Sequence, residues 1–295
     1  MKILILGTSG MLGSATYRLL PEYGHEVFGT LRQSKQTESI TNFFPNSKNL
    51  IYNIDVLNTD HLNQVITQIR PDVIINCVGI IKQLNISIDP LYVLPINSLL
   101  PHRLAELAFR VGARLVHIST DCVFDGKVGN YKETDKANAD DLYGKSKELG
   151  EIKDKPNVIT LRTSLIGHEL QSNHSLVDWF LTQSIAVRGF KKAIFSGLTT
   201  VEMAKVIQKY ILPNPKLSGL FHLSVEPISK FDLLQLIKEE YEKNIEIIPD
   251  WETSIDRSLD SSKFREITGY EPGKWRQMIF EMKSYYDKYK GNSHV

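Results

Sequence analysis

A tyrosine and a lysine four positions apart, Tyr143 and Lys147, have the residue types and the spacing for acid–base chemistry. Positions i and i+4 lie on one face of a helix, so both side chains can point into the same site. A tyrosine phenol has a pKa of about 10, and a nearby ammonium lowers this pKa because it stabilises the phenolate. The pair therefore predicts a general acid that gives a proton to a carbonyl oxygen while a hydride reaches the carbonyl carbon.

Hydroxyl and amide side chains that could assist this acid precede it in the sequence. Ser119 and Thr120 end an apolar run, where a hydroxyl either hydrogen-bonds the substrate carbonyl oxygen or caps the strand end. Asn97 opens a helical pattern, where it either caps that helix or holds a water molecule near Lys147. The histidines show no metal-ligand spacing, so the sequence predicts no metal site.

Three glycines follow the first apolar run and lead into a helical pattern, in the sequence Gly7-Thr-Ser-Gly10-Met-Leu-Gly13. In this position one glycine makes a tight turn, another lets the backbone approach a pyrophosphate, and the last lets helix and strand pack closely. The phosphates then meet the free N–H groups of the helix N-terminus. The loop predicts a dinucleotide site formed by Gly7, Ser9, Gly10, Met11, Leu12 and Gly13.

The residues after the second and third apolar runs bear on which dinucleotide binds. An NAD site usually carries an acidic residue at the end of the second strand for the ribose 2′-hydroxyl, but this chain reads Phe28-Gly-Thr-Leu-Arg32. Arg32 could instead meet a 2′-phosphate, which favours NADP over NAD, unless it is an ordinary surface arginine. Asp55, followed by Val56, either meets the adenine or caps the next helix.

Short apolar runs alternate with amphipathic stretches over residues 1–165, and this rhythm predicts the fold. Runs rich in Val, Ile and Leu without polar alternation are typical of strands buried on both faces, and alternating strands and helices form a doubly wound parallel sheet. We therefore predict an α/β protein with a dinucleotide-binding Rossmann domain over 1–165. The predicted strands are Lys2–Leu6, Glu26–Phe28, Asn49–Ile54, Asp72–Val78, Arg114–Ile118 and Val158–Arg162, and the predicted helices are Met11–Leu20, Asp60–Ile69, Asn97–Val111 and Tyr143–Lys153.

The rhythm loosens after residue 165, which predicts a smaller C-terminal α/β substrate cap over 166–295. A later return of the chain to the large sheet is expected near 190–225, with a strand at Gly219–Leu223. Helices are expected at Leu176–Ile185, at Phe231–Tyr241 with Ser229 as its N-cap, and at Lys274–Lys290.

Composition excludes several classes of protein. The 295 residues are 42% apolar and 23% charged, with a net charge of +1, which is typical of a globular chain. The balanced charge gives no electrostatic case for binding nucleic acid or an anionic membrane. No apolar run is long enough to cross a bilayer, and the two cysteines, Cys77 and Cys122, are expected as small buried side chains. We expect a cytoplasmic protein.

Four motifs together resemble the extended short-chain dehydrogenase/reductase family, and within it the dTDP-4-dehydrorhamnose reductase group. They are the glycine loop, Asn76-Cys-Val-Gly79, Ser119-Thr-Asp-Cys-Val-Phe-Asp-Gly126 and Tyr143-x-x-x-Lys147. Near the C-terminus, Arg257–Lys263 and Gly269–Trp275 are also similar to the closing segment of that group. The resemblance covers nearly the whole chain.

The resemblance implies roles for individual residues. Thr120, Tyr143 and Lys147 would form a catalytic triad, in which Thr120 orients the carbonyl, Tyr143 protonates the C4 oxygen and Lys147 also holds the nicotinamide ribose. Asn97 and the turn containing Cys77, Val78 and Gly79 would complete the dinucleotide site. The implied substrate-binding residues are Asp121, Arg162 and Ser164. Charge and position add Lys191, Lys192 and Arg257 as cations of the cap for a diphosphate, and Lys82 is added from the segment that borders the substrate.

The implied activity is NADPH-dependent reduction of the C4 keto group of a nucleotide-diphosphate 4-keto-6-deoxy sugar for cell-surface polysaccharide biosynthesis. Two departures from the group pattern matter. Ser14-Ala15 stands where some members carry a glutamate that helps a metal bridge two subunits, so neither that metal nor that dimer is carried over. Gly79-Ile-Ile-Lys82-Gln83 replaces the usual segment beside the sugar, so the substrate is either dTDP-4-dehydrorhamnose-like or a UDP-2-acetamido-4-keto-6-deoxyhexose.

Three alternatives to this interpretation stay open. NAD could replace NADP as the cofactor. The protein could be a nucleotide-sugar epimerase that keeps its NAD bound, although the lack of an acidic residue near Thr30 argues against this. It could also be a non-catalytic regulatory subunit of the same fold, although the intact triad argues against that. A homodimer formed through another surface also remains open.

Overall fold

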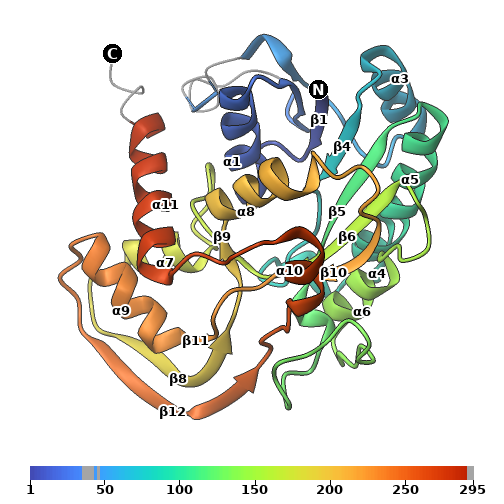
Figure 1. Cartoon of the computed structure of the whole chain (residues 1–295). Helices are drawn as coiled ribbons and strands as arrows, with labels where there is room; N and C mark the ends of the chain where they lie inside the picture. Colours follow the sequence, from blue (N-terminus) through green and yellow to red (C-terminus); the bar gives the residue numbers. More distant parts are fainter. Residues whose placement is uncertain (35–42, 45–46, 291–295) are drawn as a thin grey trace.

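The apolar runs of the N-terminal half form one parallel sheet of seven strands. The computed structural model describes residues 1–34, 43–44 and 47–290, and the spatial order of the strands is β10-β6-β5-β4-β1-β2-β3 (Figure 1). This is the Rossmann order, in which the direction of strand addition reverses between β1 and β4. The strands are β1 (Lys2–Leu6), β2 (Glu26–Thr30), β3 (Leu50–Ile51), β4 (Val73–Asn76), β5 (Arg114–Thr120), β6 (Val158–Thr163) and β10 (Gly219–His222).

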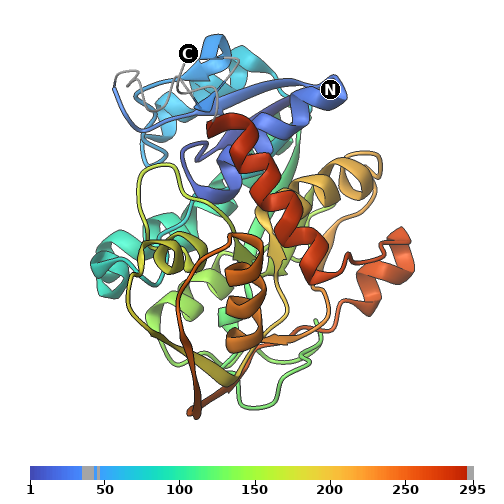
Figure 2. The same ribbon diagram turned by 90° about the vertical axis from the view of Figure 1, so that its left-hand side faces the viewer.

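Helices cover both faces of this sheet because successive strand residues point to opposite sides. Ile3 joins the core that contains α1 (Met11–Leu19), whereas the neighbouring Leu4 joins the core that contains α3 (Thr59–Ile69) and α5 (Leu100–Arg110). Figures 1 and 2 show the two layers of helices around the sheet. The remaining helical segments of this half are the α-helices α4 (Pro90–Val93) and α6 (Leu142–Leu149), the π-helix Leu94–Leu99 and the short 3-10 helices Leu20–Tyr23, Ser47–Asn49, Asn85–Ile88 and Asp121–Val123.

A second sheet, of three strands, forms the cap. Its order is β11-β8-β12, with β8 (Val187–Phe195) parallel to β12 (Ile247–Asp256) and antiparallel to β11 (Ile228–Ser229). The helix α9 (Lys230–Glu240) packs on this sheet, and the Ser229 hydroxyl caps it by accepting a hydrogen bond from the Asp232 backbone N–H. The other cap helices are α7 (Leu176–Thr182), α10 (Ser262–Thr268) and α11 (Trp275–Lys290).

The chain passes between the two sheets more than once. After β6, the two-residue strand β7 (Leu165–Ile166) pairs with β9 (Leu198–Thr199), which follows the cap strand β8. From β9 the chain continues through α8 (Thr200–Val206) and the π-helix Ile207–Ile211 into β10, which pairs with β6 at the edge of the large sheet. The long helix α11 then crosses back and packs against both α8 and α9 (Figure 2).

The predicted doubly wound α/β fold is confirmed, as is the late strand that rejoins the sheet at Gly219. The third strand is shorter than the predicted Asn49–Ile54 because Asn53 has a left-handed backbone with φ of 62° and cannot continue it. The helix predicted at Tyr143–Lys153 ends at Leu149, where Gly150 follows as the C-cap. The helix predicted at Leu176–Ile185 likewise ends early, at Thr182.

None of the three strands of the cap sheet, β8, β11 and β12, was predicted. No helix within the described residues is both long and apolar enough to cross a membrane.

Candidate active site

The carboxyl ends of β1, β4 and β5 lie side by side, and each carries one of the sequence motifs. The glycine loop follows β1, the Cys77–Gly79 turn follows β4, and Thr120 ends β5. The site therefore lies at the point where the strand order reverses, which is where ligands bind in open α/β sheets.

The glycine loop makes close backbone contacts that side chains would block. Gly7 has φ of +80°, and a Cβ there would lie only 3.0 Å from the Cγ2 atom of Val78. A Cβ on Gly13 would collide with the carbonyl oxygen of Gly7, so this glycine allows α1 to pack against the turn. Gly10 is the N-cap of α1, and within the described chain no side chain caps the free N–H groups that follow it. These features fit a pyrophosphate at the helix N-terminus.

Asn97 braces the turn after β4 rather than capping a helix. Its Oδ1 accepts a hydrogen bond from the Ile80 backbone N–H at 2.9 Å, and its Nδ2 donates to the Ile80 carbonyl at 3.0 Å and the Ser146 hydroxyl at 3.2 Å. The capping alternative is wrong because the π-helix that holds Asn97 already begins at Leu94. Asn97 therefore ties the Cys77–Gly79 turn to α6, the helix that carries the acid–base pair.

Thr120 joins the end of β5 to Tyr143. Its hydroxyl donates to Asp121 Oδ1 at 3.1 Å and accepts from the Cys122 backbone N–H at 3.1 Å, so it also caps the short helix that follows. A hydrogen bond between the Thr120 and Tyr143 hydroxyls lowers the pKa of the phenol, but burial acts more strongly and raises it above its usual range. The net direction is opposite to the lowering expected from Lys147, and it keeps the phenol protonated as a proton donor.

Lys147 is buried in the same site, with only 6% of the residue exposed. Its Nζ donates to the carbonyl of Ile118 in β5 at 2.8 Å. Burial lowers the pKa of this ammonium to about 8, because the charged form is poorly solvated, while the Glu151 carboxylate acts in the opposite direction. A Cβ on Gly79 would lie 3.9 Å from Nζ, so the turn after β4 lies close to the amine.

Residues predicted near the adenine end of the dinucleotide lie beyond β2 and β3. Arg32 is exposed just after β2, and the described residues give its guanidinium no acidic partner. Asp55 is exposed, and its Oδ1 accepts from the Leu57 backbone N–H at 2.9 Å; the cap of α3 is Asn58 instead. Val56 is half-buried beside this turn.

The two cysteines, Cys77 and Cys122, are free and lie next to the site. Both are half-buried, whereas the sequence predicted that they are buried. Burial raises the pKa of each thiol to about 12, so both are neutral. Within the described chain, no group of three or more His, Cys, Asp or Glu side chains could hold a metal ion.

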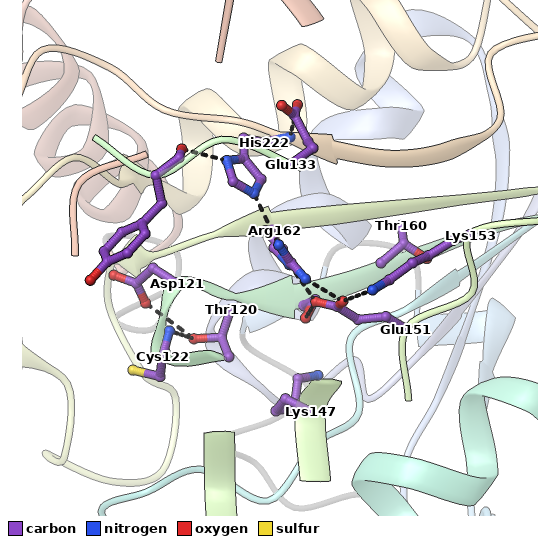
Figure 3. A network of polar contacts seen from close by, with 12 residues as sticks. Thr120, Asp121, Cys122, Glu133, Lys147, Glu151, Lys153, Thr160, Arg162 and His222 are labelled. Carbon is purple, nitrogen blue, oxygen red and sulfur yellow. Dashed lines mark hydrogen bonds and ion pairs between the residues drawn. The ribbon is translucent and has the colours of Figure 1, made fainter. Parts of the chain in front are cut away.

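Arg162, which the family resemblance assigned to the cleft, is buried in the large sheet. Its guanidinium is 1% exposed and makes two hydrogen bonds of 2.7 Å to the two oxygens of Glu151 (Figure 3). It also lies 5.1 Å above the ring of Phe124. A guanidinium satisfied in this way is part of the packed sheet, and it would leave a buried carboxylate unpaired if it turned towards a ligand.

The other predicted substrate residues are spread over the rim and the cap. Lys82 is exposed and forms an ion pair of 2.7 Å with Asp141. Asp141 is the N-cap residue of α6. Asp121 is buried, and burial raises the pKa of its carboxyl, which the nearby Arg257 opposes. Ser164 is half-buried between β6 and β7.

The predicted cap cations lie on or beside β8 and β12. Lys191 pairs with Asp232 at 3.0 Å and lies 3.8 Å from the centre of the Phe231 ring. Lys192 is exposed on the same strand, whereas Arg257 follows β12 and donates from Nε to the Phe124 carbonyl at 2.8 Å. That last contact holds the end of the cap strand against the loop that follows Thr120.

Two polar residues of the site were missed from the sequence. Glu151 stands four positions after Lys147, so the same spacing argument could have found it. Lys230, the first residue of α9, lies near Asp121, whose carboxylate raises the pKa of this lysine against the lowering by burial. No local pattern signals Lys230, because its place depends on how the cap packs against the large sheet.

Comparisons with known proteins agree with this arrangement. The chain matches the RmlD substrate binding domain family over residues 1–287. It is 27% identical over 310 residues to a dTDP-4-dehydrorhamnose reductase of Aggregatibacter actinomycetemcomitans, with 96% of this chain and 99% of the relative covered.

Two solved structures are similar over almost the whole chain. A hypothetical dTDP-4-dehydrorhamnose reductase from Sulfolobus tokodaii gives a TM-score of 0.75 at 28% identity, covering 93% of this chain and 98% of the other. The dTDP-4-dehydrorhamnose reductase of Bacillus anthracis in complex with NADP gives 0.76 at 21% identity, covering 96% and 98%. The chain therefore belongs to the RmlD substrate binding domain family and is an NAD(P)-dependent oxidoreductase of the extended short-chain dehydrogenase/reductase type.

Proposed function

We propose that this protein reduces the C4 keto group of a nucleotide-activated 4-keto-6-deoxy sugar, with NADPH as the preferred hydride donor. The observation that carries the proposal is the meeting of Thr120, Tyr143 and Lys147 at the strand ends beside the glycine loop. A protonated phenol and a buried ammonium in one site suit the reduction of a carbonyl.

The residues around the glycine loop fit a dinucleotide. Gly10 leaves bare backbone at the start of α1, where a phosphate must approach, while Gly7 and Gly13 allow the tight turn and the close packing behind it. Gly79 brings no side chain close to the amine of Lys147. The absence of an acidic residue after β2 and the exposed guanidinium of Arg32 support NADPH over NADH. The bound nicotinamide would supply the hydride.

Each catalytic side chain has a distinct task in the transfer. The Thr120 hydroxyl hydrogen-bonds the substrate carbonyl oxygen and fixes its direction relative to Tyr143. The Tyr143 O–H donates its proton to that oxygen as negative charge develops there. The Lys147 ammonium, held by the Ile118 carbonyl, stabilises the phenolate that remains. Thr120 and Lys147 are buried and Tyr143 is half-buried, which limits the access of water and strengthens these interactions.

The cap supports a substrate that carries a diphosphate. Lys191 and Lys192 lie on β8, and Arg257 and Lys230 lie near Asp121, which follows the carboxyl end of β5. Cations are the usual partners of phosphate oxygens. The relatives named as dTDP-4-dehydrorhamnose reductases support a sugar nucleotide of this kind.

The test is to incubate the protein with NADPH and a panel of dTDP- and UDP-linked 4-keto-6-deoxy sugars and to follow the cofactor by absorbance. We expect oxidation of NADPH with at least one sugar and a product that carries a hydroxyl at C4. Oxidation with none of them would refute the proposal. An epimerase would instead keep NAD bound and interconvert sugars without net oxidation, and a regulatory subunit would bind NADPH without consuming it.

A further inference from the structure

One acidic side chain near the catalytic lysine is buried completely. Glu151 follows the end of α6 by two residues, and its carboxylate has no exposed surface. Its Oε1 accepts from the Ser119 hydroxyl at 2.8 Å and from Arg162 Nε at 2.7 Å, and its Oε2 accepts from Arg162 Nη2 at 2.7 Å (Figure 3). Lys153, whose side chain is about half exposed, adds an ion pair at 3.4 Å. The position of the carboxylate is therefore fixed by at least four contacts.

This carboxylate is anchored across three strands of the large sheet. Ser119 lies in β5 and Arg162 in β6, and the Nη1 of Arg162 lies 3.3 Å from the Nε2 of His222 in β10 (Figure 3). The other ring nitrogen of His222 lies 2.9 Å from the Tyr131 carbonyl. Such a connected network has little freedom to rearrange, so the charge of Glu151 stays where the sheet places it.

Of the described titratable side chains that act on the Lys147 ammonium, Glu151 is the one that carries a negative charge. The Cys77 thiol after β4 is neutral because burial raises its pKa to about 12. His117 in β5 is neutral because burial and Lys147 itself lower its pKa well below the usual value. Among the described residues, Glu151 is thus the one acidic side chain that acts on Lys147 in favour of the charged amine.

We propose that Glu151 is a positioning residue of this reductase: the clamp formed by Ser119 and Arg162 holds its carboxylate where it keeps the buried Lys147 ammonium charged during turnover. The inference rests on the proposed function for the role of Lys147, but the charge on the amine can be measured without any sugar. Burial alone would drive this amine towards its neutral form, which cannot stabilise a phenolate.

The sign of the pH dependence follows from the Lys147 pKa. The folded-state pKa of about 8 lies below the ordinary 10.5, so the unfolded chain binds more protons between these values. The contribution of Lys147 to stability therefore rises with pH across that window. Loss of turnover above about pH 8 would then report loss of the ammonium and not unfolding of the protein.

The test measures the titration of Lys147 by NMR in the full chain labelled at its lysine side chains, with the signal assigned by its loss in Lys147→Arg. The single variant Glu151→Gln leaves the buried Arg162 unpaired and is expected to fold poorly. The double variant Glu151→Gln/Arg162→Met removes both charges together and carries the test. We expect its Lys147 midpoint to fall by about one unit or more. The alkaline limb of kcat/KM should fall with it.

Glu148→Gln is the matched control, since it makes the same carboxylate-to-amide change on α6 at a residue that does not act on Lys147. Its midpoint should equal that of the wild type. An unchanged midpoint in the double variant would overturn the inference even if the sugar is reduced normally. A lowered midpoint in a protein that reduces no sugar would support the electrostatic role and refute only the proposed function.

Discussion

The basic side chains of the large sheet and of the cap sheet differ in what holds them. Arg162 in β6 is 1% exposed and forms a bidentate pair with a fully buried carboxylate. Lys191 in β8 has a side chain that is 24% exposed and makes one contact with Asp232, whose side chain is 53% exposed. Pairs of the second kind are worth about 0–1 kcal/mol, so the lysine can exchange its partner for a ligand phosphate at little cost.

This difference indicates which basic side chains are able to bind the phosphates of a substrate. A buried guanidinium with two bonds to its partner is fixed as part of the fold, and taking it away leaves an uncompensated charge. A partly exposed ammonium with a weak partner remains free to bind an anion. Changes at the ends of β5 and β6 should therefore alter kcat or folding, whereas changes on the cap should alter KM.

The largest effect is expected from Tyr143→Phe, which removes the proton donor at the strand ends. Turnover should fall by about 100- to 10,000-fold, while the affinity for NADPH, measured by its fluorescence, should stay close to that of the wild type. Tyr92→Phe is the control, because Tyr92 is 56% exposed on α4. Normal turnover in Tyr143→Phe would show that the strand ends do not carry the chemistry.

The next effect concerns folding and separates the two sheets directly. Arg162→Met leaves the Glu151 carboxylate buried without its guanidinium and should lower the free energy of unfolding by about 3–5 kcal/mol in urea denaturation. Arg276→Met removes a cap pair between α11 and Glu239 of α9, in which the two side chains are 67% and 54% exposed, and should cost under about 1 kcal/mol. Equal losses in the two variants would contradict the contrast drawn between the sheets.

On the cap, Lys191→Met should raise KM for the sugar nucleotide with little change in kcat. Loss of one charge-assisted hydrogen bond of about 1.5–3 kcal/mol corresponds to roughly a tenfold or larger increase. The control is Lys145→Met, an exposed lysine on α6 that lies between the two catalytic positions. A fall in kcat with unchanged KM would mean that the cap takes part in the chemical step.

The large sheet could be predicted from the sequence because its signals are local. The run Lys2–Leu6 is buried on both faces and directly precedes the glycine turn, so its apolar pattern and the glycines that end it predict the same strand. The cap strands lack such signals: β8 carries Arg188, Lys191 and Lys192, and most residues of β12 are exposed and include Pro249. Their pairing depends on packing against α9, which no short-range pattern describes.

The site shows the same division between local and distant information. Tyr143 and Lys147 were found by spacing along one helix, and Thr120 by its place at a strand end. The family resemblance assigned Arg162 to the cleft, and no local pattern shows that the Glu151 carboxylate binds its guanidinium within the sheet. Lys230 was missed because only the folded cap brings it near Asp121.

The smallest effect is expected from Arg32→Ala, at a cation just after β2 of the large sheet that is exposed like Lys192 of the cap. Because the described residues give its guanidinium no acidic partner, it can bind a 2′-phosphate without breaking an ion pair. One exposed contact of about 1 kcal/mol corresponds to roughly a fivefold change in affinity. The variant should therefore bind NADPH several-fold more weakly and bind NADH as before, in fluorescence titrations of both cofactors.

An unchanged ratio of the two affinities would exclude Arg32 from cofactor selection, and weaker binding of both would indicate a role in positioning the loop after β2. If only NADPH binding weakens, a cation of this protein can bind a ligand when it is exposed and has no acidic partner, whichever sheet it belongs to.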